Sequence, residues 1–458
     1  MLKRKPFLLP LVIAALCGAA PAPRVVNLSF ADAQPILQAM DDVLPPELKG
    51  KLSDAQAAAW LPWLKARDAA VRARLLQGDE DTMINFLLFG VTFTSQPRVT
   101  ETDLTALQAS QPVPVLQTRI EDLLRGIVAP GTNERLLFLR RLLQQKGFTP
   151  TAKEKLRTYL LDNVRRVLRE QESYRQIIAS ARLQGGANAE FVERSQLYRE
   201  RGLSLDTSLK PNFALDQSLH ALQTRGMLTE VRRVAVIGPG LDFTDKAGGY
   251  DFYPEQTIQP FLLLDSLLRL KLATEADVRL MTFDISPRIN AHLTRARLRA
   301  SKGVGYNMQL PRDARVKWNP ELLKFWETCG AQIGKPIPPA PVPTGLRELQ
   351  LRAVQVRPTV VAKVTPMDLN VVFQHVELPE AEKFDLIVAT NILVYYNAFE
   401  QALALKNIER MLKPGGFLLS NNALLELPSS QVRAAGYLTA VYSDQEADGD
   451  HIVWYRRK

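Results

Sequence analysis

The sequence VRRVAVIGPG at residues 231–240 decides the fold, because a short run rich in β-branched residues leads directly into a Gly-Pro-Gly turn. Further runs of this kind alternate with stretches of helical spacing. The expected strands cover 231–237, 278–283, 370–376, 384–390 and 416–420, and the expected helices cover 260–272, 287–300 and 402–412. This alternation predicts an α/β fold with a doubly wound, mostly parallel sheet. Two adjacent closing strands, 438–442 and 451–455, predict an antiparallel hairpin at one edge.

Small or polar residues stand where several of these strands end. Gly238 and Gly240 follow the first strand, Asp284 ends the second, and Asn391 follows the strand at 384–390. Such sheets bind ligands at the carboxyl ends of their strands, so we expect these residues to share one edge. Glycine lets the backbone approach a ligand closely, and a carboxylate accepts hydrogen bonds from ribose hydroxyls. A dinucleotide fingerprint would need a third glycine near Phe243, which is absent, so an NAD-type site is disfavoured.

Taken in order, these segments resemble the class I S-adenosylmethionine-dependent methyltransferases, which have a Rossmann-like fold. The resemblance covers about 231–455, roughly half of the chain, and its most specific parts are FDIS at 283–286, FDLIVATNIL at 384–393 and LKPGGFLL at 412–419. The stretch NILVYY at 391–396 is also similar, over a short length, to chemotaxis-receptor (CheR-type) glutamate methyltransferases.

The resemblance implies S-adenosylmethionine as the cofactor and gives individual residues a role. It implies that Gly238 and Gly240 line the methionine part of the cofactor. Asp284 would bind the ribose, and Asn391 would lie near the sulfonium. No zinc or other metal site is expected, because two cysteines and four scattered histidines offer almost no ligand set.

The sequence departs from the family pattern at three positions. The acid usual inside the first strand falls on Val236, and the third glycine of the first loop falls on Asp242. The acid usual after the third strand, near the adenine, is replaced by the neighbourhood of Gln374 and His375. Asp242 and Gln374 are therefore included among the cofactor-binding candidates. The Asn-Pro-Pro-aromatic signature of base methylation is absent after Asn391, which disfavours a DNA methyltransferase.

Candidate substrate residues lie in two places. The loop GGYDFYPEQ at 248–256 is dense in aromatic residues. Tyr250 and Tyr253 are candidates to close over a ligand, and Asp251 or Glu255 is a candidate base. The alternative is that these aromatic side chains pack on the sheet edge. Tyr395, close to the end of the strand at 384–390, is a further candidate.

The residues before this half are predicted to be helical. We expect an all-α domain over 32–205, with one helix from the Ser53 region ending at Gly78, and the α/β domain over 206–458. An insertion is expected at about 301–368, with the proline-rich run at 336–343 as an extended connector. The pair Trp60 and Trp63 is interpreted as helix-packing core.

The N-terminal residues are predicted to be a targeting segment and not part of a folded domain. Residues 1–22 run from a cationic start through an apolar stretch to small residues, which predicts a secretory signal peptide or membrane anchor, with possible membrane contact through residues 7–22. The expected location is outside the cytoplasm or at the membrane. The alternative is a cytoplasmic protein with an apolar tail.

The composition excludes few functions. Hydrophobic residues at 46% and charged residues at 23% are those of a globular protein, which argues against wholesale disorder. The net charge of +10 includes three of the first five residues, and no block of basic residues indicates nucleic-acid binding. The leading hypothesis is methyl transfer from S-adenosylmethionine to an unidentified acceptor. The alternative is a non-catalytic exported binding or scaffold protein that keeps the fold.

Overall fold

The computed structural model describes residues 23–458 except 110, 171, 174–175, 178–197, 199–200, 243–249, 347, 422 and 446–447. The expected signal peptide or anchor at 1–22 lies outside the described residues. Within them, no helix combines the length and the apolar character needed to cross a membrane.

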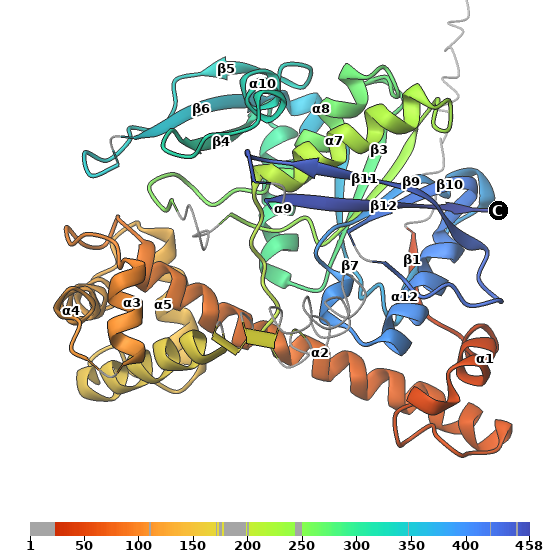
Figure 1. Cartoon of the computed structure of the whole chain (residues 1–458), viewed down its shortest axis with the longest axis horizontal. Helices are drawn as coiled ribbons and strands as arrows, with labels where there is room; N and C mark the ends of the chain where they lie inside the picture. Colours follow the sequence, from red (N-terminus) through yellow and green to blue (C-terminus); the bar gives the residue numbers. More distant parts are fainter. Residues whose placement is uncertain are drawn as a thin grey trace, which may run out of the picture.

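A seven-stranded sheet forms the centre of the C-terminal half (Figure 1). In spatial order its strands are β11 (Val432–Val441), β12 (Gly449–Arg457), β10 (Leu412–Ser420), β9 (Phe384–Ala389), β2 (Arg233–Ile237), β3 (Arg279–Asp284) and β7 (Val364–Asp368). The strands from β10 to β7 are parallel, and β11 and β12 form an antiparallel pair at the edge beside β10. The predicted Rossmann-like sheet and its edge hairpin are therefore confirmed.

The chain order reverses at β2. From β2 the chain builds outward through β3 to β7, and it then returns to the other side of β2 with β9 and β10. A crevice forms at such a switch point, because the connections on either side of it leave in opposite directions. The switch point lies at the carboxyl ends of β2 and β9.

Side chains alternate between the two faces of the sheet, and each face has its own helices. Val234 and Val236 of β2 pack with α7 (Leu209–Thr224), α8 (Gln259–Arg269) and α9 (Pro287–Ala300). Ala235 and Ile237 pack on the opposite face with α12 (Ala398–Met411), α1 (Phe30–Ala39) and the first half of α2 (Ser53–Phe89). The short 3-10 helices η1 (Asp41–Val43), η2 (Glu380–Glu382) and η3 (Leu393–Tyr395) lie in connections.

The third strand of the sheet is β7, and the expected strand at 370–376 was misplaced. β7 has the sequence VTPMD and pairs only with β3, so Pro366 is tolerated at the sheet edge, where no ladder partner needs its missing N–H. Only the end of the expected segment is a strand, β8 (Gln374–Glu377), and it pairs with β1 (Arg24–Asn27) in a separate two-stranded sheet.

The insertion before β7 is a small antiparallel sheet packed over one end of the molecule (Figure 1). Its strands lie in the order β4 (Tyr306–Asp313), β6 (Leu349–Val356) and β5 (Gly334–Ile337), with α10 (Pro320–Thr328) and α11 (Pro358–Val361) beside them. The first residues of the proline-rich run end β5, and residues 338–343 have no regular structure, as expected for a connector.

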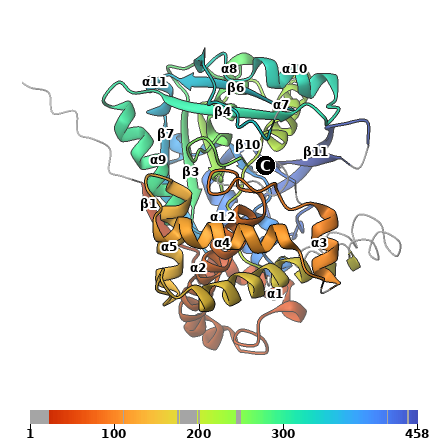
Figure 2. The same ribbon diagram turned by 90° about the vertical axis from the view of Figure 1, so that its left-hand side faces the viewer.

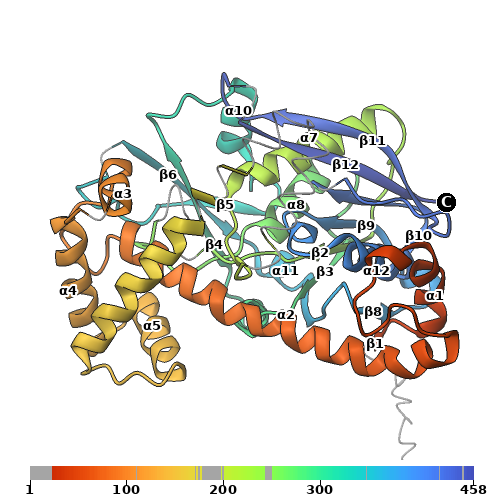
Figure 3. The same cartoon turned by 60° about the horizontal axis from the view of Figure 1, so that its bottom comes forward.

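Helix α2 is a single helix of 37 residues, about 55 Å long, and does not end at Gly78 as predicted. A Cβ at Gly78 would lie 1.9 Å from the carbonyl oxygen of Leu203. Glycine at this position therefore permits the close approach of another backbone segment and does not break the helix. Figure 3 shows α2 running from α1 beneath the sheet to the helical group at the far end.

That helical group, which faces the viewer in Figure 2, has a hydrophobic core of its own. It contains α3 (Glu101–Gln108), α4 (Pro114–Val128), α5 (Glu134–Gln145), the helical residues 153–170 and the second half of α2. The first half of α2 packs instead with the sheet, where Trp60 and Leu64 are buried. The segment expected as one domain, 32–205, thus packs in two places.

Candidate functional site

A cavity of about 990 Å³ lies at the carboxyl edge of the sheet, at the switch point. The loops that follow β2, β3, β7 and β9 all line it. Its opposite wall comes from residues 203–208 and Tyr198, and its far end from the loop after β10 and the β11–β12 hairpin. Four strand ends therefore converge on one hollow, as expected of a ligand site in a sheet of this kind.

The two predicted glycines form the floor of the cavity. Gly238 and Gly240 have φ values of 65° and 72°, a backbone region that residues other than glycine rarely adopt. A Cβ on Gly238 would lie 2.1 Å from Cδ1 of Ile392, and a Cβ on Gly240 would lie 2.6 Å from Cβ of Thr207. Glycine is required here by conformation and by space, and both residues line the cavity.

Asp284 ends β3 at the cavity wall and is 7% exposed. Its Oδ1 accepts a hydrogen bond of 2.7 Å from the Ser286 amide, and its carbonyl oxygen accepts one of 2.8 Å from Asn290 Nδ2. Burial, opposed by the Ser286 amide and assisted by the nearby Asp368 carboxylate, raises the pKa of Asp284 to about 7. The structure thus presents a desolvated carboxylate that has capacity to accept further hydrogen bonds.

Asn391 follows β9 and has the left-handed conformation, with a φ of 58°. Its amide donates to Asn421 Oδ1 at 2.8 Å, and its Oδ1 accepts from Asn421 Nδ2. Beside it, Thr390 Oγ1 accepts a hydrogen bond of 2.8 Å from Gln259 Nε2. These polar side chains line the cavity between the two glycines and its far end.

Gln374 does not line the cavity but supports a residue that does. Its Oε1 accepts a hydrogen bond of 3.0 Å from the amide of Asn370, and its Nε2 lies 3.4 Å from Asn27 Oδ1 on β1. Asn370 follows β7 and lines the cavity together with its neighbours Leu369 and Val371. The loop after β7, and not the Gln374 side chain, forms this wall.

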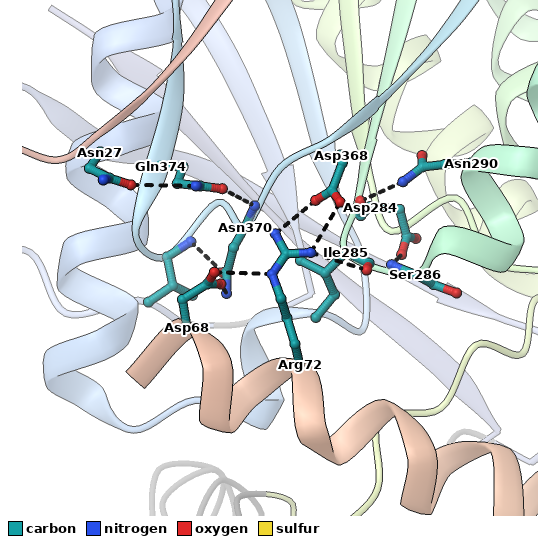
Figure 4. A network of polar contacts seen from close by, with 11 residues as sticks. Asn27, Asp68, Arg72, Asp284, Ile285, Ser286, Asn290, Asp368, Asn370 and Gln374 are labelled. Carbon is teal, nitrogen blue, oxygen red and sulfur yellow. Dashed lines mark hydrogen bonds and ion pairs between the residues drawn. The ribbon is translucent and has the colours of Figure 1, made fainter. Parts of the chain in front are cut away.

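The sequence analysis found no acid after the third strand, but the structure has one there, Asp368. It ends β7 and is paired with Asp284 in the β3–β7 register. Its carboxylate forms a bidentate ion pair with Arg72 of α2, at 2.7 Å and 3.2 Å (Figure 4). Sequence reasoning missed Asp368 because the third strand was expected six residues later, and it missed Arg72 because nothing in a helix sequence reveals a partner 296 residues away.

Asp242 lies just outside the cavity wall. It is 8% exposed, and its Oδ2 accepts hydrogen bonds of 2.9 Å from the hydroxyl of Tyr253 and from Gln256 Nε2. Its backbone bridges to Gln256. Asp242 and Tyr253 therefore fasten the loop after β2 to the segment before α8, and neither lines the cavity.

Two more of the substrate candidates hold the helical group in place. Both carboxylate oxygens of Asp251 accept backbone hydrogen bonds, of 2.8 Å from Val91 and 2.9 Å from Thr92. The ring of Tyr250 stacks under the guanidinium of Arg98, 4.8 Å from the ring centroid. Neither residue lines the cavity. The residues 243–249 that precede them lie outside the described part of the chain.

Tyr395, the fourth substrate candidate, does line the cavity. Its ring meets that of Tyr198 edge-on at 5.2 Å, and Arg74 of α2 donates to its carbonyl oxygen at 3.2 Å. The arrangement places one aromatic wall between α2 and the end of β9.

The described residues hold no cluster of three or more histidine, cysteine or acidic side chains that could bind a metal ion. His292 is buried, and its Nε2 lies 2.8 Å from the hydroxyl of Tyr306. His375 Nδ1 lies 2.9 Å from Oδ1 of Asn407. Neither histidine lines the cavity.

Residues 349–420 match the family described as a methyltransferase domain, and this segment contains the loops after β7 and β9 that line the cavity. No curated protein matches the sequence significantly.

Solved structures similar to the chain include a TehB-like SAM-dependent methyltransferase from Corynebacterium glutamicum (10% identity, TM-score 0.21, covering 54% of this chain and 98% of that one). A second is human N-acetylserotonin methyltransferase in complex with SAM (11% identity, TM-score 0.25, covering 87% of this chain and 98% of that one). A third is SibL, an S-adenosylmethionine-dependent methyltransferase in its apo form (10% identity, TM-score 0.22, covering 78% of this chain and 96% of that one).

Proposed function

From the premise that its C-terminal half carries a class I S-adenosylmethionine-dependent methyltransferase domain, we propose that this protein transfers a methyl group from that cofactor to an acceptor bound in the same cavity. One observation carries the proposal. Gly238, Gly240, Asp284 and Asn391, which come from three strand ends far apart in the sequence, line one cavity at the switch point of the sheet.

The residues present fit the cofactor. Gly238 and Gly240 line the cavity and carry no side chain, so the methionine part can approach their backbone closely. Asp284 offers a buried carboxylate to the ribose hydroxyls, and the loop at Asn370 forms a wall for the adenine. When bound, S-adenosylmethionine supplies an electrophilic methyl group on its sulfonium. The chain's part is to align the acceptor with that methyl group and to exclude water.

We further propose that the acceptor occupies the cavity beyond Asn391, between residues 203–208 and the β11–β12 hairpin. Among the described residues that line the cavity, none is a lysine or arginine, and two carboxylates, Asp206 and Asp450, lie in this part of it. This charge favours a neutral or cationic acceptor, such as an amine or a hydroxyl compound, over a carboxylate. It therefore disfavours the glutamate acceptor that the short CheR-type resemblance implies.

Calorimetric titration of the full chain with S-adenosylmethionine tests the central proposal. We expect saturable binding by the wild-type protein and none by Gly240→Val, because the added side chain meets the backbone of residues 205–206 and Thr207. Circular dichroism of both proteins separates lost binding from lost folding. No heat of binding at millimolar cofactor would contradict the proposal and would favour the non-catalytic scaffold hypothesis.

We also propose, from the sequence of residues 1–22 alone, that the chain is exported or membrane-anchored. A reporter that is active only outside the cytoplasm, fused after residue 40, is expected to be active. A reporter active only inside the cytoplasm would instead place the protein where S-adenosylmethionine is made.

A further inference from the structure

Helix α2 reaches the cofactor end of the cavity from outside the methyltransferase domain. Arg72 forms the bidentate ion pair with Asp368 after β7, and its Nη1 also lies 3.4 Å from the carbonyl oxygen of Ile285 after β3. One turn earlier on the same helix face, Asp68 Oδ1 accepts a hydrogen bond of 2.7 Å from Asn370 Nδ2. Two residues of α2 thus hold the two loops between which the ribose and adenine would lie (Figure 4).

The two side chains also hold each other. Arg72 Nε donates to Asp68 Oδ2 at 3.0 Å, which fixes the guanidinium on the helix before it reaches Asp368. The contact with Asp368 uses both outer nitrogens of the fork, a geometry that arginine can make and lysine cannot. The loop after β3 and the loop after β7 are therefore set at a fixed separation by one planar group.

This separation matters because the two loops carry neighbouring carboxylates. Asp284 and Asp368 are partners in the parallel register of β3 and β7. Two like charges on adjacent strand ends repel each other, and a cation beside one of them relieves the repulsion. Arg72 occupies that place.

We propose that Arg72 is a positioning residue for the adenosine half of the cofactor: it fixes the spacing of the loops after β3 and β7 and neutralises Asp368, so that the Asp284 carboxylate is available to the ribose. This inference rests on the proposed function. It assigns part of the cofactor site to the N-terminal helical segment, which the matched family region does not include.

The charge arrangement around Asp284 gives the proposal a pH signature. Asp284 is faced by Asp368 on β7, Arg288 at the start of α9, Arg72 on α2 and Tyr396 after β9. Asp368 raises the pKa of Asp284, whereas Arg288 and Arg72 lower it. Loss of the Arg72 charge therefore raises this pKa further, and loss of the Asp368 charge lowers it.

The experiment measures the dissociation constants of S-adenosylmethionine and of 5′-methylthioadenosine by calorimetry on the full chain, from pH 5.5 to 9. The second probe keeps the ribose hydroxyls but has no amino-acid part, whose amine would itself titrate near pH 8. For Arg72→Met we expect about tenfold weaker binding of both probes, which corresponds to the loss of one charge-assisted interaction. The pH below which binding weakens should move upward.

Two further variants separate charge from geometry. Arg72→Lys keeps the charge but not the fork, so we expect intermediate affinity with the wild-type pH profile. Asp368→Asn, at a side chain that is 57% exposed, should move the profile to lower pH. This opposite shift keeps the proposal open to refutation even where Arg72→Met does not fold.

Arg67→Met is the matched control. Arg67 lies on the same helix, is 31% exposed against 29% for Arg72, and also pairs with the sheet domain, through Glu400 at 2.5 Å. It does not contact the cofactor loops, so its loss should change stability without changing either dissociation constant or the pH profile.

The possible results are distinct. Failure of the wild-type protein to bind either probe would overturn the proposed function and this inference with it. Binding by the wild type, combined with unchanged affinity and pH profile in the Arg72 and Asp368 variants, would overturn this inference alone. Equal losses in Arg67→Met and Arg72→Met would likewise show that α2 acts only through general stability.

Discussion

Replacement of Asp284 by asparagine should weaken cofactor binding and at the same time stabilise the protein. The two side chains have nearly the same shape, and asparagine Oδ1 can still accept the hydrogen bond from the Ser286 amide. The substitution removes a charge that burial disfavours and that a ribose would use. Opposite effects on binding and stability are expected wherever a ligand site retains a desolvated ionisable group.

The stability effect follows from the raised pKa. Burial, the largest cause, raises the pKa of Asp284 to about 7, whereas an unfolded chain has an aspartate pKa near 4. Between these values the folded protein binds more protons than the unfolded one, so this residue lowers stability as the pH rises from about 4 to about 7. The full penalty applies above pH 7 and amounts to at most about 4 kcal/mol. Asp284→Asn should therefore gain up to that amount at pH 8 and little at pH 4.

The binding effect comes from the hydrogen bonds to the ribose. A hydrogen bond to a charged group is stronger than a neutral one by about 1 kcal/mol, so two hydroxyls account for about 2 kcal/mol. This difference corresponds to roughly thirtyfold weaker binding of S-adenosylmethionine at pH 8.

Urea unfolding at pH 4.5 and pH 8, together with calorimetry at pH 8, checks both effects. Asp265→Asn is the control, because Asp265 is also buried with a pKa raised by burial but does not line the cavity. Its affinity for the cofactor should equal that of the wild type. An Asp284→Asn protein that is less stable than the wild type at pH 8, or that binds within threefold of it, would refute the reasoning.

Three other substitutions test separate parts of the structure. Gly238→Ala should lower both the melting temperature and the cofactor affinity, because the new Cβ meets Ile392 at a position with positive φ. A thermal scan and calorimetry measure the two effects, and an unchanged affinity would contradict the place of Gly238 in the floor of the cavity. Asp251→Ala should lower the free energy of unfolding, measured in urea, by about 2–4 kcal/mol, because it leaves the backbone amides of Val91 and Thr92 without their acceptor. Cofactor affinity should not change, and a loss of affinity in a fully folded variant would indicate that Asp251 has a ligand role after all. Arg119→Met should cost about 3–5 kcal/mol, since this buried side chain donates to four backbone carbonyls; a change below 1 kcal/mol would contradict that role.

The sequence was sufficient to predict those strands of the sheet whose local pattern agrees with their burial. The β-rich runs at β2, β3 and β9 are buried on both faces and read as strands without ambiguity. The small or polar residues at their ends, Gly238, Asp284 and Asn391, could be placed at one edge because parallel strands share a direction.

The remaining features depend on contacts between distant segments. β7 contains a proline and reads as a loop, yet its edge position tolerates it. The apolar run at 370–376 reads as a strand, but its valines and Phe373 fill the core between the sheet and the N-terminal segment. The loop at 250–253 offered candidate residues to close over a ligand, but Asp251 binds the backbone of Val91 and Tyr250 contacts Arg98, both on the helical group. No local pattern specifies these partners.

The continuity of α2 has a consequence for folding. Its first half contributes Trp60 and Leu64 to the core on one face of the sheet, and its second half contributes Phe86 and Leu87 to the core of the helical group. A helix that belongs to two cores transmits the loss of either to the other, so the two halves of the protein should unfold in one cooperative transition. A chain that began at residue 206 would keep α12 on that face of the sheet but lose the part of the apolar cover that α1 and the first half of α2 supply. We therefore expect residues 206–458 not to fold as an independent unit.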